Sequence, residues 1–290
     1  MLFLLFLFII PFSFYGQTFS NKIGEQVATD WVFNSEYIQT KRIKRITGRF
    51  TIKLKGVPMK ETNYWQVFDF DSLGRILRSY ETRKDDGTKD TVWTNYFYND
   101  KGLLIYKSVG DKEKLTYWTT VYDSEKRITA KEEFERKKDR KGTMRTVEKG
   151  KEFNTYETDG KMIKTLINDF GIPFSKETYY YDANGKIIRT ENHVISTDDE
   201  MISHFIYDHN GNLILKKTEI SKQGIEQEKI QFSYDISGNL IAKKVLLGDK
   251  LIQETQFIYN DQTGYLSAIL MEEDSSSNIL ILRIKEYQYY

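Results

Sequence analysis

The pattern that most of this chain repeats is clearest between Glu177 and Glu191, where the sequence reads ETYYYDANGKIIRTE. The aromatic run 179–181 suits a β-strand, residues 182–185 suit a tight turn, and residues 186–191 suit the returning strand. Asp182 can bond to the backbone two residues on, and Gly185 adopts positive φ without steric cost. The stretch therefore predicts a β-hairpin with a type I turn closed by a glycine bulge.

The same hairpin pattern recurs along the chain from Trp65 onward. Each unit has an aromatic residue, here called the anchor, followed by Asp, Asn or Glu; the anchors are Phe70, Tyr98, Tyr122, Tyr156, Tyr181, Tyr207, Tyr234 and Tyr259. A turn glycine follows in every unit except the third, where Lys126 takes its place: Gly74, Gly102, Gly160, Gly185, Gly211, Gly238 and Gly264. An apolar residue follows each turn: Ile76, Leu104, Ile128, Met162, Ile187, Leu213, Leu240 and Leu266. Eight such matches indicate a repeat protein, in which Asp182, Gly185, Asp208, Gly211, Asp235 and Gly238 are structural turn residues.

The number of hairpins sets the expected fold class. Eight hairpins imply about sixteen strands in one antiparallel meander, wider than open sheets usually run without curling. The residue before the anchor points to the opposite sheet face and is apolar or aromatic in five units: Phe97, Val121, Tyr180, Ile206 and Ile258. Both faces are therefore expected to be partly covered. We expect an all-β fold, a long, strongly twisted antiparallel β-meander of repeated hairpins coiled into a roll or partial spiral shell.

The N-terminal residues predict export. Residues 2–10 are apolar, too few to span a bilayer, and are followed by Pro11, as in a secretory signal peptide. Cleavage between Gly16 and Gln17 would leave residues 17–64 as an N-terminal β-rich segment capping the array and residues 65–290 as the hairpin repeat array. The expected location is the periplasm, the outer surface or the extracellular space, with no membrane span after signal cleavage.

Charge and composition limit the partners that the chain can attract. Lys plus Arg number 43 against 42 Asp plus Glu, so no global field draws the chain to nucleic acid, and no nucleic-acid partner is expected. The chain has no cysteine, which excludes disulfides, thiolate metal sites and cysteine nucleophiles.

The units resemble the YD repeat of the RHS and teneurin family, whose signature is Tyr-Asp, two variable residues, Gly and a short apolar strand. Residues 181–185 (YDANG), 207–211 (YDHNG) and 234–238 (YDISG) match this signature closely. The resemblance covers roughly Trp65 to Tyr290 and is closest to short secreted YD-repeat proteins of Bacteroidetes-type bacteria. It implies a spiral β shell and an association with carbohydrate binding.

A basic stretch near the N-terminus has two interpretations. Between Thr40 and Lys60 there are seven basic residues and no acidic one, and Lys41, Arg42, Lys44 and Arg45 lie at its start. The stretch could be a patch for a polyanion such as an acidic glycan, or the charged edge strand of a β-sheet. The sequence leaves both open.

Three tryptophans are candidate ligand-binding residues. Trp65 and Trp93 each stand five residues before an anchor, so both are expected on the sheet face opposite the anchors, in a row that could support the rings of a glycan. Trp118 stands four residues before Tyr122 and is expected on the anchor face. The alternative is that these tryptophans fill a core under the N-terminal segment.

The sequence contains little that predicts catalysis. None of the three histidines, His193, His204 and His209, has a zinc or nucleophile-elbow spacing, the turn acids lack the other ligands of a calcium loop, and no phosphate-binding loop is present. We expect no cofactor, no metal and no enzymatic activity, although many carboxylate pairs leave a glycosidase open. The function expected is a secreted or cell-envelope binding protein for a glycan or other envelope polymer. The alternative is a structural component of an RHS-like shell or surface complex that contacts other envelope proteins through its sheet edges.

Overall fold

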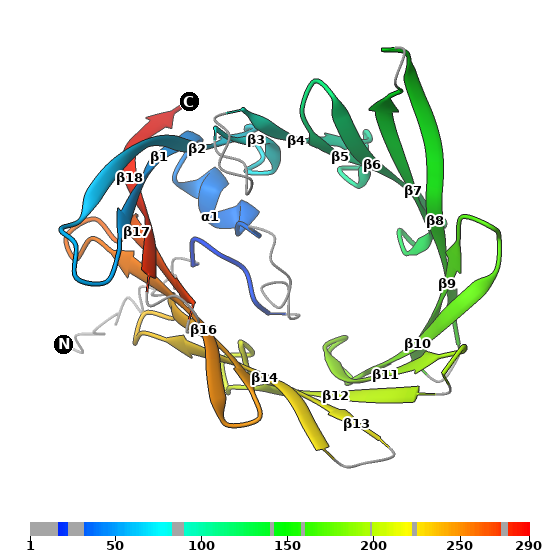
Figure 1. The fold of residues 1–290 in the computed structure, drawn as a ribbon. Helices are drawn as coiled ribbons and strands as arrows, with labels where there is room; N and C mark the ends of the chain where they lie inside the picture. The colour runs from blue at the N-terminus through cyan, green and yellow to red at the C-terminus, as the bar shows by residue number, and fades with distance from the viewer. Residues whose placement is uncertain are drawn as a thin grey trace, which may run out of the picture.

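The computed structural model describes residues 17–22, 32–82, 90–139, 142–157, 160–197, 199–221, 225–273 and 278–290, so the predicted signal peptide lies outside the described residues. A single 18-stranded sheet dominates the described chain. Each strand pairs antiparallel with the next along the chain, and β1 (Ile43–Lys53) pairs with both β2 (Lys60–Phe70) and β18 (Asn278–Tyr289). The sheet is therefore a closed up-and-down barrel, and Figure 1 shows its strands as a ring.

The strands between β2 and β18 are the two arms of the repeated hairpins and their bounds follow the repeat. They are β3 (Ile76–Glu81), β4 (Val92–Tyr98), β5 (Leu104–Gly110), β6 (Lys114–Tyr122), β7 (Ile128–Lys138), β8 (Met144–Tyr156), β9 (Lys161–Asn168), β10 (Pro173–Tyr181), β11 (Ile187–Val194), β12 (Asp199–Tyr207), β13 (Leu213–Ile220), β14 (Ile225–Tyr234), β15 (Leu240–Leu247), β16 (Lys250–Tyr259) and β17 (Leu266–Glu273). Each anchor ends the first arm of its hairpin, and the apolar residue after the turn begins the second arm in every unit except the fourth, where Met162 is the second residue of β9.

Closure corrects the expected roll or partial spiral shell. The all-β hairpin meander is confirmed, but it closes because β1, from the N-terminal segment, pairs along its length with the last strand: Arg49 lies opposite Arg283, and Phe50 lies opposite Leu282. We call the pairing of β1 with β18 the seam. It gives both end strands of the meander a hydrogen-bonding partner, which the end strands of an open sheet would lack. The predicted boundary between Tyr64 and Trp65 falls inside β2, and β1 lies in the same sheet as the repeat strands.

The turn chemistry predicted for the repeat is confirmed. Gly185, Gly211 and Gly238 have φ of 77°, 83° and 82°, and in the Gly185 turn the glycine N–H donates to the Asp182 carbonyl. The Asp182 carboxylate accepts hydrogen bonds from the Asn184 and Lys186 N–H groups. Lys126, which replaces the glycine in the third unit, adopts a φ of 65° there. The turn geometry is thus kept even where the residue is unfavourable for it.

Seven tyrosines join their hairpin to the one before it through a backbone carbonyl, whereas the Tyr181 hydroxyl contacts the Met162 Sδ. Tyr207 donates its hydroxyl hydrogen to the Ile187 carbonyl (2.8 Å), just before the point where the β11–β12 ladder begins at Arg189. The same bond is made by Tyr98 to Ile76, Tyr122 to Leu104, Tyr156 to Ile128, Tyr234 to Leu213, Tyr259 to Leu240 and Tyr287 to Leu266. Tyr287, in the final half unit, therefore serves as a ninth anchor. Each hydroxyl satisfies a carbonyl at the turn end of the barrel.

The N-terminal residues lie inside the barrel rather than over one end of the array. The short helix α1 (Ser35–Thr40) and residues 17–22 lie within the ring of strands, on the side of β1, β2 and β14–β18 (Figure 1). Phe19 and Ile38 are fully buried, and Phe19 stacks near Phe257 at a centroid distance of 5.2 Å. Phe33 contacts both Phe68 and Phe70 edge-on. The anchor face is therefore the inner face of the barrel.

Candidate functional site

The inner face is mostly buried in one half of the barrel and partly exposed in the other. In β1, β2 and β13–β18 the inward side chains around the N-terminal residues form the core, and most of them are buried. The inward side chains of β4–β11 alternate with outward ones in the same way. Only Met162 and Ser175 among them are buried, and the others are partly exposed. A ligand that entered the barrel would therefore meet the inner face of β4–β11.

Trp118 is the largest side chain on this solvent-reached face and lies among polar partners. Its indole, on β6, has the Lys107 ammonium of β5 at 5.7 Å from the ring centroid and the Lys131 ammonium of β7 at 6.0 Å. Lys107 also lies over the ring of Tyr96 on β4, at 5.6 Å. We call Tyr96, Lys107, Trp118 and Lys131 the Trp118 cluster. Cation–π contacts of this kind hold the two ammonium groups beside the indole.

Two carboxylates lie in register with the Trp118 cluster. Glu133 is opposite Trp118 on β7, and Glu152 is opposite Lys131 on β8. Among the described residues Lys131 makes no ion pair within 4.0 Å. The inner face thus combines ammonium donors, carboxylate acceptors and an aromatic surface within three strands.

In a second polar cluster on the same face, the charged and hydroxyl groups are paired with one another. Lys164 on β9 pairs with Glu177 on β10 (2.6 Å), and the Tyr179 hydroxyl donates to the same carboxylate (2.5 Å). Burial raises the pKa of Tyr179 to about 12. Burial would lower the pKa of Lys164, but Tyr179 and Glu177 outweigh it and raise that pKa above its ordinary value. These groups join β9 to β10, and most of their hydrogen-bonding positions are already used within the cluster rather than open to a ligand.

The inward lysines follow a repeat that the sequence reading missed. Lys107, Lys131, Lys216 and Lys243 each follow their anchor by nine residues, and Lys164 follows its anchor by eight. In the register these lysines lie opposite the inward residue two before an anchor, as Lys107 lies opposite Tyr96. The offset of nine residues was the signal that could have located them from the sequence.

Trp65 and Trp93 lie on the outer face, as predicted from their spacing. Trp93 is opposite Tyr80, with ring centroids 4.5 Å apart, and the Arg78 guanidinium lies 5.2 Å from its ring. The Arg49 guanidinium lies 5.4 Å from the ring of Trp65. The two tryptophans are thus outside the core under the N-terminal segment, and the chain's own arginines lie over both rings. Trp118 lies on the anchor face, also as predicted.

The outer face carries apolar side chains at the position before several anchors. Phe97, Val121, Ile206 and Ile258 are 55%, 53%, 49% and 43% exposed. These four side chains are thus only partly covered, and the described N-terminal residues lie inside the barrel. The structure adds an outer aromatic row across four strands, in which Phe97, Tyr106, Tyr117 and Phe134 follow one another at centroid distances of 5.4, 5.5 and 5.0 Å.

The four basic residues of the proposed polyanion patch have separate surroundings. Lys41, just after α1, lies over the rings of Tyr37 and Tyr265. Lys44 lies over Tyr290, and Arg42 adopts a φ of 54° in the turn before β1. Arg45 pairs with Asp69 (2.5 Å), which also pairs with Arg78. The structure thus spreads these cations over several contacts, and β1 between two strands is not an edge strand.

No three His, Asp or Glu side chains of the described residues gather as ligands of a metal ion would. No helix in the described part of the chain is long and apolar enough to cross a membrane.

Comparisons with known proteins give distant structural likenesses. No family model matches the chain, and no curated protein matches it. A porin-like protein from Bacteroides uniformis is 9% identical, with 84% of this chain and 97% of that chain covered and a TM-score of 0.33. A porin-like protein from Bacteroides vulgatus gives the same four values. A LolA superfamily protein from Nitrosomonas europaea is 8% identical, with 86% and 87% covered and a TM-score of 0.26. Scores this low assign neither a family nor a function.

Proposed function

We propose that this chain is an exported, non-enzymatic binding protein that holds a glycan or a related envelope polymer against the inner face of its barrel. The observation that carries the proposal is the Trp118 cluster, an aromatic surface flanked by ammonium groups on a face that solvent reaches. Sugar hydroxyls accept hydrogen bonds from ammonium groups and donate them to carboxylates, while the apolar faces of sugar rings contact aromatic side chains. Lys131, Glu133 and Trp118 provide these three kinds of contact.

The likeness of the hairpin units to YD repeats supports this proposal, because that family is associated with carbohydrate binding. The apolar N-terminal residues 2–10 support export. Mass spectrometry of the exported protein would test this part: a mature chain beginning at or near Gln17 is expected, and an intact Met1 would refute it.

The alternative, assembly through sheet edges, has less to support it. It required strand ends able to accept or donate a strand, but the Tyr287–Tyr289 end of β18 is paired with β1. No described strand is left as an edge of the sheet. A contact through the outer aromatic row would be a different mode of assembly.

A binding experiment with matched variants tests the proposal. Purified protein would be screened on a glycan array, and each hit would be titrated with wild type, Trp118→Ala and Trp93→Ala. Truncating a stacking aromatic should weaken binding by roughly tenfold or more. Because Trp93 lies on the outer face, Trp93→Ala should bind like wild type.

The charge of the cluster gives a second pair of variants. Lys131→Met removes an inward ammonium group, and Lys176→Met removes an exposed outward one at equal cost in net charge. Only Lys131→Met should lower the affinity for the glycan that wild type binds. Equal affinity for wild type and a folded Trp118→Ala variant, or no binding to any glycan by folded wild type, would refute the proposal.

A further inference from the structure

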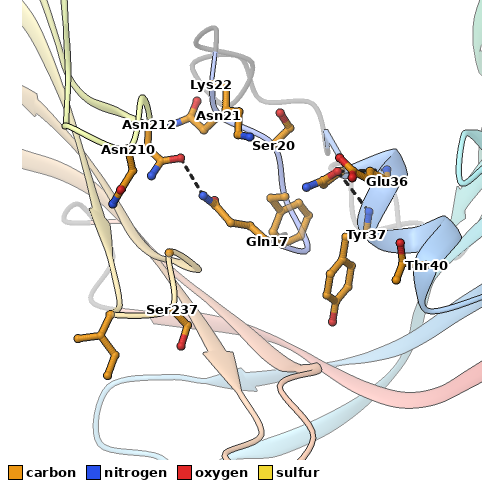
Figure 2. Close-up of a pocket in the computed structure, with 14 residues that line it drawn as sticks. Gln17, Ser20, Asn21, Lys22, Glu36, Tyr37, Thr40, Asn210, Asn212 and Ser237 are labelled. Atoms are coloured by element: carbon orange, nitrogen blue, oxygen red, sulfur yellow. Dashed lines mark hydrogen bonds between the residues drawn. The ribbon is translucent and has the colours of Figure 1, made fainter. Parts of the chain in front are cut away.

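A cavity separate from the Trp118 cluster lies where the N-terminal segment meets the hairpin turns. It has a volume of about 530 Å³ and is lined by the N-terminal segment 17–22, by α1 with its cap residue Asn34, and by the turns after β12 and β14. Figure 2 shows Gln17 reaching from the N-terminal segment across this cavity toward Asn212, with Tyr37 on the α1 side. The volume lies within the range of roughly 300–1,000 Å³ that small-molecule sites occupy.

The cavity wall is polar but almost uncharged. Amides and hydroxyls face it from three separate elements, namely Gln17, Asn21, Asn34, Asn212, Thr40 and Ser237. Among the described residues of the wall the charged side chains are Lys22 and Glu36, and both are exposed. Phe19 and Tyr37 add aromatic surface. The described side chains of this wall suit a ligand with several hydroxyl groups, because they both donate and accept hydrogen bonds and offer no buried charge to an ion.

One amide in the wall has an unused acceptor. The Gln17 side chain is 9% exposed, and its Nε2 donates to the Asn212 Oδ1 (2.8 Å). Its Oε1 is buried without a hydrogen-bond partner among the described residues. Buried amide oxygens are normally paired, and this one is not. It has almost no surface open to the cavity, so a ligand hydroxyl would bond to it after a rotation of the Gln17 amide.

The other amides of the wall show that the site is held rigidly. Asn21 donates to the Tyr234 hydroxyl (2.8 Å), and the Leu213 N–H donates to the Asn21 carbonyl (3.1 Å). Asn34 caps α1 by accepting from the Glu36 and Tyr37 N–H groups. The Asn21 bonds tie the N-terminal segment to the barrel, and the Asn34 cap stabilises the first turn of α1. A wall that is fixed before a ligand binds lowers the entropic cost of binding.

From this geometry we propose that the cavity binds a small neutral polyhydroxylated molecule of mono- or disaccharide size. The proposal stands on the cavity and on Gln17 and does not depend on the Trp118 cluster. The same chemistry is offered by a free sugar and by the end residue of a longer chain.

The repeat provides a matched pair of variants for the test. Asn212 and Asn239 follow equivalent turn glycines, and each uses its N–H and its Nδ2 to bond the turn aspartate, Asp208 or Asp235. Only Asn212 also accepts from Gln17 and lines the cavity. Asn212→Ala and Asn239→Ala should therefore lose the same turn contacts, whereas only Asn212→Ala changes the cavity.

Isothermal titration calorimetry would use glucose, galactose and N-acetylglucosamine as free sugars, their linear disaccharides as chain ends, and galacturonate as a charged control. At least one neutral sugar should bind wild type, galacturonate should bind more weakly, and Asn212→Ala should reduce the affinity about tenfold while Asn239→Ala leaves it unchanged. Gln17→Met, which removes both amide atoms without touching a turn, should give the same loss if Asn212→Ala does not fold.

The outcomes separate this proposal from the one before it. Trp118→Ala should leave sugar binding in the cavity unchanged, so failure at either site is visible independently. If the disaccharides bind and the monosaccharides do not, the ligand is the end of a longer chain. If the monosaccharides bind with the same affinity as the disaccharides, the ligand is a free sugar. No heat from folded wild type with any neutral sugar, or equal losses in Asn212→Ala and Asn239→Ala, would overturn the proposal.

Discussion

Gly74 and Gly185 provide a direct test of the position of α1 inside the barrel. They occupy equivalent turns with nearly equal φ, 76° and 77°. A Cβ on Gly74 would lie 1.9 Å from the Ser35 carbonyl oxygen and 2.8 Å from the Gln39 nitrogen, both backbone atoms of α1, whereas a Cβ on Gly185 would meet nothing within 4 Å. The two alanine variants therefore share the backbone strain and differ only in the collision with α1.

The size of the difference follows from these contacts. Left-handed backbone costs a residue with a Cβ roughly 1–2 kcal/mol, and both variants should lose this much. Gly74→Ala must also displace α1, which adds about 1–3 kcal/mol, the usual cost of overpacking. In a chain of 290 residues each kcal/mol lowers the Tm by roughly 2 °C, so Gly74→Ala should melt about 2–6 °C below Gly185→Ala.

Far-UV circular dichroism melts of wild type, Gly74→Ala and Gly185→Ala would measure the difference. Gly160→Ala is a further control, because its Cβ also meets nothing within 4 Å at a φ of 81°. Equal Tm losses in all three variants would show that α1 does not lie against the Gly74 turn.

Three further predictions concern single side chains. Tyr207→Phe removes the hydrogen bond to the Ile187 carbonyl and should cost about 1–2 kcal/mol in a urea titration; an unchanged midpoint would contradict the role given to the anchors. Lys126→Gly relieves a φ of 65° and should raise the Tm by about 1–2 °C, whereas a lower Tm would mean that the turn favours lysine. Burial would raise the pKa of Asp69, but two arginines outweigh it and lower that pKa. Its ion pairs therefore stabilise the fold above its ordinary pKa and are lost as the pH falls through the lowered value. In thermal melts from pH 7 to pH 3, the Tm of Asp69→Asn should fall less with decreasing pH than the Tm of wild type. An equal fall of Tm in the two proteins would contradict this.

The parts of the fold that depend on neighbouring residues could be predicted from the sequence. Asp182 and Gly185 define their turn through contacts within five residues, and the alternation of side chains placed Trp93 outside and Trp118 on the anchor face.

Closure could not be predicted because it depends on residues far apart in the chain. Arg49 and Arg283 are partners across the seam, and nothing near either residue specifies the other. The repeat also does not show that residues 17–22 and α1 enter the barrel, because the contact with Gly74 is made by backbone atoms of α1. The Trp118 cluster is formed by side chains of separate strands, and the cavity by three separate segments.

Closure of the sheet through β1 and β18 is the central claim, and a cross-link across the seam tests it most directly. The chain has no cysteine, so Arg49→Cys and Arg283→Cys introduce a single pair at positions that the register places opposite each other. Directly opposed antiparallel residues have Cα separations of about 4.5–5.5 Å, which a disulfide can bridge. The closed barrel predicts rapid formation of an intramolecular disulfide under mild oxidation, seen by non-reducing electrophoresis and peptide mass mapping, and none in the control Arg49→Cys with Lys176→Cys. Disulfides that form only between molecules, or equally in the two double variants, would contradict closure.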